Sequence, residues 1–317
     1  MRYAVYLPLL FPLVAALAAR PLGERLPPRL ASWLLTFGAV VLAAASSLVL
    51  GMLAITGLIR FPLLARLANG RWSAQVAQDH DPASLSVGLL AGALLAAAVA
   101  AAAWMLCRRV RTLAAAAAEA ACMPGRDQLV VVEDAAAEAY AIPGRPGRIV
   151  VSTGMLDALD PAEHEILLSH ERAHLRHHHH LFVAFAQLAS AANPLLRPLA
   201  ATITYTVERW ADESAATATG DRRRVARTVG KAALAARHTR ARSRIPRAAL
   251  GILGLGQAGP GPVPRRVAAL MAPPPHNRVL PLALTAGLLL ATGLCAAEAA
   301  HDLEALLEMA KHAASRG

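Results

Sequence analysis

The stretch Asp160-Pro-Ala-Glu-His-Glu-Ile-Leu-Leu-Ser-His-Glu-Arg-Ala-His-Leu-Arg176 has the pattern of a helix that begins with a strong cap. Asp160 suits the N-cap, Pro161 suits the first helical position, and Glu163 stands where a capping-box carboxylate belongs. The apolar residues that follow the cap give this helix one buried side. The stretch therefore predicts a well-defined helix that starts at Pro161.

Residues 170–174 of this helix form an H-E-x-x-H motif. Because a helix turns by about 100° per residue, His170 and His174 lie on one face, one turn apart. Two imidazoles at this spacing can bind one tetrahedral Zn²⁺, and Glu171 lies within reach of a water on that ion. The motif predicts a zinc hydrolase with His170 and His174 as metal ligands and Glu171 as the catalytic residue.

A second helix, expected from about Leu199 to Thr219 and ended by Gly220, carries two carboxylates four residues apart. Glu208 and Asp212 therefore share a face. A zinc site with two histidines needs a third ligand, and a further carboxylate often holds a ligand imidazole in place. The alternative is a solvated E-x-x-x-D face, but beside the upstream motif we favour Glu208 as the third ligand of one Zn²⁺ ion and Asp212 as the supporting carboxylate.

The composition indicates a membrane protein. The chain has 317 residues, of which 56% are hydrophobic, and a net charge of +11. Apolar runs of about 20 residues are typical of transmembrane helices, with a signal peptide as the alternative for the first run, which Pro8 and Pro12 interrupt. The expected spans are about 3–19, 33–59 and 85–107 within residues 1–111, and a fourth at 279–300 before a short tail of 301–317.

The arginines predict an orientation. Arg108, Arg109 and Arg111 directly follow the third span, and positive residues favour the cytoplasmic side. We therefore expect a multi-pass protein of the cell membrane with the soluble domain, residues 112–278, in the cytoplasm. No zinc-finger, helix-turn-helix or stacking-aromatic pattern accompanies the basic charge, so we expect the bilayer as a partner and no direct nucleic acid binding.

Before the motif, the soluble domain shows the pattern of a small sheet. Residues 128–133 read as a strand, and residues 139–152 read as a hairpin with its turn at 143–147. An edge strand near the metal could hold a peptide substrate by backbone pairing. A purely structural role for the hairpin is the alternative.

Two segments after the motif allow different interpretations. The run His177 to His180 could be a second metal site, but a polar helix end near the membrane is favoured, because four consecutive helical residues cannot all face one ion. Residues 221–247 are arginine-rich with a helical pattern. Residues 251–275 are rich in Gly and Pro, which predicts a mobile linker.

The chain resembles the BlaR/MecR-type membrane zinc metallopeptidases. The resemblance rests on its predicted spans and on Tyr140-Ala-Ile-Pro-Gly-Arg, Val151-Ser-Thr-Gly-Met-Leu, Leu168-Ser-His-Glu-Arg-Ala-His-Leu and Glu208-Arg-Trp-Ala-Asp212. More distantly, the two helices look like the CAAX-protease and heat-shock membrane peptidase group. The resemblance implies an α+β zincin-like (gluzincin) domain inserted into a multi-pass α-helical membrane protein. Because little sequence follows the fourth span, we expect no C-terminal penicillin-binding sensor domain.

The resemblance also implies an activity, a zinc-dependent endopeptidase that cleaves a protein or peptide substrate. For the best-known members this substrate is a transcriptional repressor of the BlaI/MecI type. A non-catalytic membrane protein with a structural zinc site is the main alternative, and a metal transporter that uses the histidine run is a weaker one. Tyr205, Arg209 and His238 are the candidates for stabilising an oxyanion.

Overall fold

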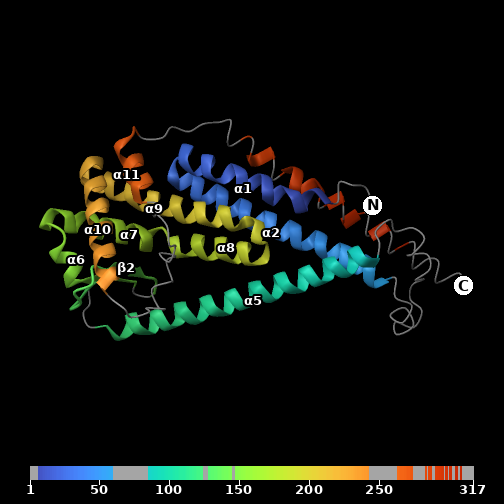
Figure 1. Cartoon of the computed structure of the whole chain (residues 1–317), viewed down its shortest axis with the longest axis horizontal. Coiled ribbons are helices and arrows are strands. Elements are labelled where there is room, and N and C mark those ends of the chain that lie inside the picture. The colour runs from blue at the N-terminus through green and yellow to red at the C-terminus, as the bar shows by residue number, and fades with distance from the viewer. Residues whose placement is uncertain are drawn as a thin grey trace, which may run out of the picture.

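The computed structural model describes residues 6–59, 85–123, 128–144, 147–242 and 263–273, with scattered positions between 283 and 308. Three long helices, α1 (Leu7–Arg25), α2 (Pro28–Ile59) and α5 (Leu85–Cys122), run along the molecule, and a small sheet with its neighbouring helices gathers at one end (Figure 1). The protein is thus mostly helical, with the sheet placed before the metal-motif helix.

These three helices are long and apolar enough to cross a membrane. Large apolar side chains on their outer faces stay exposed, among them Leu17, Leu90 and Trp104, which suits a surface that contacts lipid. The helices extend further than the predicted spans, since α5 continues well past Cys107. The fourth predicted span, 279–300, is described only in part, and its described residues include a shorter apolar helix at Thr285–Cys295.

The proline-rich stretch between the first two predicted spans is partly helical. Helix α1 continues to Arg25, with Pro21 inside it, and only Leu26 and Pro27 separate it from α2. Proline normally disrupts a helix interior, but here the end of α1 packs against a later helix, and the guanidinium of Arg209 donates a hydrogen bond of 2.7 Å to the Gly23 carbonyl. Tertiary contacts therefore outweigh the local signal.

The sheet confirms the predicted strand and hairpin. Its strands are β1 (Leu129–Val132), β2 (Ala139–Ile142) and β3 (Arg148–Ser152), in the order β1-β3-β2. β2 and β3 pair antiparallel, as a hairpin requires, and β1 pairs parallel with β3. All five residues of β3 are buried, whereas β2 lies at an edge of this sheet.

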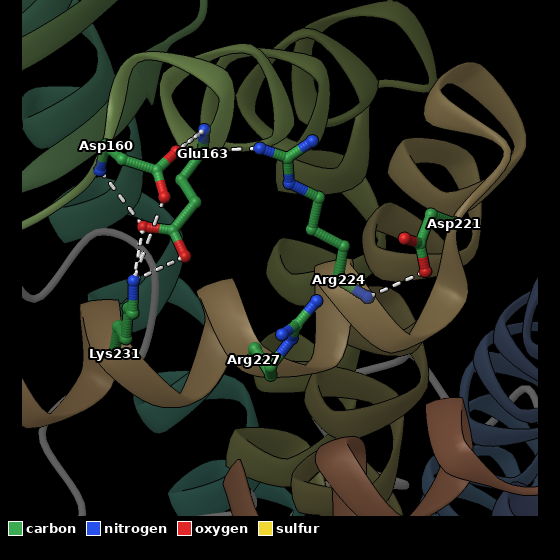
Figure 2. Close-up of a pocket in the computed structure, with 6 residues that line it drawn as sticks. All are labelled: Asp160, Glu163, Asp221, Arg224, Arg227 and Lys231. Atoms are coloured by element: carbon green, nitrogen blue, oxygen red, sulfur yellow. Dashed lines mark hydrogen bonds and ion pairs between the residues drawn. The ribbon is translucent and has the colours of Figure 1, made fainter.

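Helix α6 (Thr153–Asp157) follows β3 directly, and the motif helix α7 spans Pro161–Arg176. The predicted cap is confirmed, because the Asp160 carboxylate accepts a hydrogen bond from the Glu163 N–H and the Glu163 carboxylate accepts one from the Asp160 N–H. Lys231 of α10 (Arg222–Arg242) forms an ion pair of 2.7 Å with Glu163 (Figure 2). The hollow in Figure 2 is thus lined by charged side chains, and the pair of Lys231 with Glu163 anchors the start of α7.

Two further helices connect α7 to the long helices. These are α8 (His179–Ala192) and α9 (Arg197–Thr219), and Gly220, with φ of 71°, ends α9 as predicted. A large cluster of buried apolar side chains joins α1 and α2 to α8 and α9, with Phe182, Ile203 and Trp210 among its members. The helix that carries Glu208 and Asp212 is therefore held by the same core as the first two spans.

The prediction of a mobile linker at 251–275 is wrong for the second half of this range. Residues Val263–Met271 form the helix α11, which packs against α9 and α10. Leu270 is buried in a cluster with residues of α7, α9 and α10, and Val267 packs against that cluster. Because these two apolar side chains are three residues apart, they lie on one face of α11. Burial of this face stabilises the helix despite the prolines around it.

Candidate metal centre

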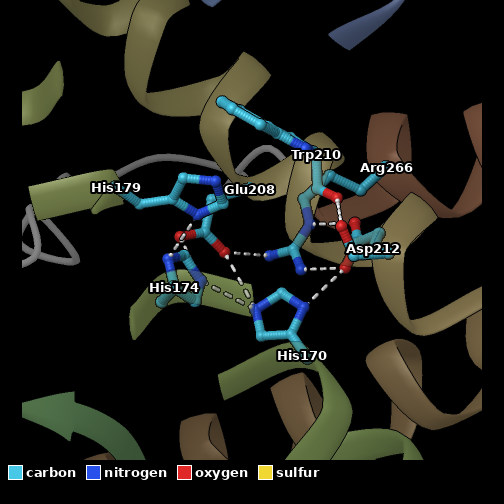
Figure 3. Close-up of polar contacts among 8 residues, drawn as sticks. His170, His174, His179, Glu208, Trp210, Asp212 and Arg266 are labelled. Atoms are coloured by element: carbon cyan, nitrogen blue, oxygen red, sulfur yellow. Dashed lines mark hydrogen bonds and ion pairs between the residues drawn. The ribbon is translucent and has the colours of Figure 1, made fainter. Parts of the chain in front are cut away.

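Helix α7 presents the two motif histidines to the same point in space. The Nε2 atoms of His170 and His174 lie 3.1 Å apart (Figure 3). Both side chains are largely buried, as is Glu171 between them in the sequence. The motif has therefore folded as its spacing predicts.

Helix α9 brings the predicted third ligand to these histidines. The Glu208 carboxylate oxygens lie 3.7 Å from His170 Nε2 and 3.6 Å from His174 Nε2. Ligand atoms bound about 2.0–2.1 Å from a tetrahedral zinc ion stand roughly 3.3–3.4 Å from one another. The donor types and spacings thus fit one such ion, and this is the group that could hold a metal among the described residues.

Asp212 supports His170 from the side opposite the metal position. Its Oδ1 lies 3.1 Å from His170 Nδ1, although the ring N–H is not aligned well enough on this oxygen for a regular hydrogen bond. The Asp212 side chain is 1% exposed, so water does not weaken this contact. This places Asp212 where a carboxylate can orient a ligand imidazole.

Sequence reasoning missed Arg266, which α11 inserts into this cluster. Its Nε and Nη2 lie 2.7 and 2.6 Å from the two Asp212 carboxylate oxygens, a bidentate pair. Its Nη1 lies 2.9 Å from Glu208 Oε2. Arg266 thus holds both carboxylates of the E-x-x-x-D pair in one arrangement (Figure 3).

The buried charges shift the proton affinities of the cluster. Burial lowers the pKa of His170, but the Asp212 and Glu208 carboxylates outweigh it and raise this pKa to about 10. Burial also raises the pKa of Glu171 to about 7 and lowers that of His174 to about 4. Burial tends to raise the pKa of Glu208, but Arg266 and the histidines hold it well below its usual value.

These shifts leave the metal-free cluster close to neutral. Protonated His170 and Arg266 offset Glu208 and Asp212. A divalent cation in place of the His170 proton would add one positive charge, which ionised Glu171 offsets. The charge balance therefore fits zinc as well as the ligand geometry does.

Two of the three candidate oxyanion residues contact other groups, and the third is exposed. Arg209 donates to the Gly23 carbonyl, Tyr205 lies with its ring 4.1 Å from the Arg265 guanidinium, and His238 is exposed on α10.

The histidine run only partly follows its prediction. His177 and His178 form the turn between α7 and α8, as expected for a polar helix end. His179 is fully buried instead, and its Nδ1 lies 3.0 Å from Nδ1 of His174. The cluster in Figure 3 thus includes a third histidine, His179, whose burial the sequence pattern did not reveal.

Comparison with known proteins supports a peptidase. Residues 106–197 match the family model described as Peptidase family M48. No curated protein and no solved structure matches the chain. The matched region contains His170, Glu171 and His174 but ends before Glu208, so the third ligand is assigned from geometry. A metallopeptidase is therefore supported by the family match and by the position of Glu208, which lies outside the matched region.

Proposed function

We propose that the protein is a membrane-bound, zinc-dependent endopeptidase. The observation that carries this proposal is the meeting of His170, His174 and Glu208 within 4.8 Å of one another, with the buried Glu171 beside them. A structural zinc site gains nothing from a carboxylate directly after its first ligand, whereas hydrolysis requires a base at that place.

The residues have separate tasks in this mechanism. His170, His174 and Glu208 would hold Zn²⁺, which when bound polarises a carbonyl and lowers the pKa of a water to about 7. Glu171 accepts a proton from the attacking water and passes it to the leaving amine nitrogen. Without the metal, burial raises the pKa of Glu171 to about 7, so this carboxyl can both take up and release a proton near neutral pH.

The edge strand β2 supports a peptide as substrate. The backbone N–H of Ala141 in β2 contacts the Glu171 carboxyl, so this strand passes directly beside the proposed base. An extended chain that pairs with a strand edge presents its backbone carbonyls at regular intervals. We expect the substrate to lie along β2 with its scissile carbonyl near Glu171.

The narrower assignment follows from the sequence resemblance. We propose a BlaR/MecR-type peptidase with four spans, a cytoplasmic peptidase domain and a regulatory protein as substrate, such as a BlaI/MecI-type repressor. The arginines after the third predicted span support this orientation. The three long apolar helices support insertion into the membrane.

The test compares Glu171→Gln with wild type in detergent, measuring bound zinc and cleavage of a candidate repressor. We expect one zinc per chain in both proteins and loss of cleavage only in the variant. Glu165→Gln, an exposed position on the same helix, is the matched control and should cleave normally. Equal cleavage by zinc-loaded Glu171→Gln and wild type would refute the assigned base, and a zinc-loaded wild type that cleaves no substrate would favour a structural site.

A further inference from the structure

The turn between α7 and α8 brings His179 back over the metal motif. His178 adopts a left-handed backbone, with φ of 52°, and among the described residues it is the one non-glycine with positive φ. Histidine is one of the residue types that tolerate this conformation better than most. The reversal places the His179 side chain against His174 rather than in solvent (Figure 3).

The contact with His174 uses the nitrogen that metal binding leaves free. His174 directs Nε2 toward Glu208 and His170, and its Nδ1 lies 3.0 Å from Nδ1 of His179. A neutral imidazole that binds a metal through Nε2 carries its proton on Nδ1. In that state His174 is the donor and His179 Nδ1 is the acceptor.

The surroundings of His179 are apolar, so packing alone does not explain a histidine at this position. The side chain is 0% exposed and lies among aromatic rings, with the Trp210 ring centroid 4.7 Å away. Its second nitrogen, Nε2, is buried and has no hydrogen-bond partner in the part of the chain that the structure describes. An unpaired buried polar group destabilises the fold, so an apolar side chain would stabilise this position better.

We propose that His179 is a positioning residue that fixes the tautomer and ring orientation of His174 for metal binding. It acts on the second ligand as Asp212 acts on the first, but with a neutral acceptor in place of a carboxylate. The inference rests on the proposed function in one respect, because it requires a metal at His174 Nε2.

The test measures zinc affinity of the full chain in detergent by competition with a chelator. His179→Leu removes the acceptor and keeps an apolar side chain, and we expect zinc binding to weaken about 10- to 100-fold. His179→Asn should restore most of the affinity, because its amide oxygen occupies the place of Nδ1, whereas His179→Gln should not. The visible spectrum of the Co²⁺-loaded protein should change in the leucine and glutamine variants and stay close to wild type in the asparagine variant.

His180→Leu is the matched control, since His180 follows His179 in α8 and its ring contacts His178, not His174. It should bind zinc like wild type. Wild-type affinity in His179→Leu, or equal affinities in the asparagine and glutamine variants, would overturn the positioning role. Absence of zinc binding by wild type would instead count against the proposed function, so the two failures are distinguishable.

Discussion

Replacing Arg266 by methionine tests how the active-site carboxylates are held together. The change removes the bidentate partner of Asp212 and the contact with Glu208, while methionine keeps a flexible apolar side chain of similar length. Asp212 is 1% exposed, so it would lose its strongest partner without gaining water. Breaking a buried ion pair in this way costs about 3–5 kcal/mol.

Arg265→Met is the control for this change. Arg265 is the preceding residue, and its ion pair with Glu24 joins side chains that are 39% and 40% exposed. Such pairs contribute about 0–1 kcal/mol, and the contact of Arg265 with the Tyr205 ring adds about 0.5–1 kcal/mol. Arg266→Met should therefore be clearly less stable than its neighbour.

The assay is thermal unfolding in detergent, followed by loss of the helical circular dichroism signal, with and without zinc. For a protein of 150–250 residues, Tm falls by about 2–4 °C per kcal/mol of lost stability. We therefore expect Arg266→Met to lower Tm by roughly 10 °C without metal. Zinc should recover part of this loss, because its charge offsets Glu208, and Asp212 retains His170 as a neighbour. A Tm equal to that of Arg265→Met would refute the view that Arg266 holds the cluster.

Three further predictions concern metal binding and the fold. The pKa of His170 is raised to about 10, so below that pH zinc must displace a proton from this side chain. The apparent zinc affinity, measured by competition with a chelator, should therefore rise about tenfold per pH unit between about pH 7 and 9. An affinity that does not change with pH would contradict this. Asp160→Ala removes the cap of α7 and should cost about 1 kcal/mol, measured by chemical unfolding, and an unchanged midpoint would show the cap to be dispensable. Gly154→Ala places a Cβ against the Ala135 carbonyl and should destabilise by about 1–3 kcal/mol, whereas Gly230→Ala, with open space around it, should stabilise helix α10 slightly; a stable Gly154→Ala protein would argue against the close approach.

The parts of the site that could be predicted are those encoded within single helices. His170 and His174 share a face because of helical spacing, and Glu208 and Asp212 do so for the same reason. The contact between these two faces could be inferred because a zinc site with two histidines needs a third ligand, and Glu208 is a carboxylate of the kind that supplies one. The periodicity of the α-helix was the only geometric rule that this inference used.

Arg266 and His179 could not be predicted because their roles depend on contacts between elements. Arg266 is 54 residues from Asp212 in the sequence, and the proline and glycine around α11 concealed its short apolar face. His179 reaches His174 only because His178 reverses the chain direction. A run of four histidines gives no sign of which member is buried.

The core shared by α1, α2, α8 and α9 has a practical consequence for anyone who wishes to isolate the peptidase. A fragment beginning at residue 112 would leave Phe182, Ile203 and Trp210 without the helices that now cover them. Such a fragment should aggregate, because it would expose a continuous hydrophobic surface to water. The protease and its anchor are, in this sense, one folding unit that has to be purified together.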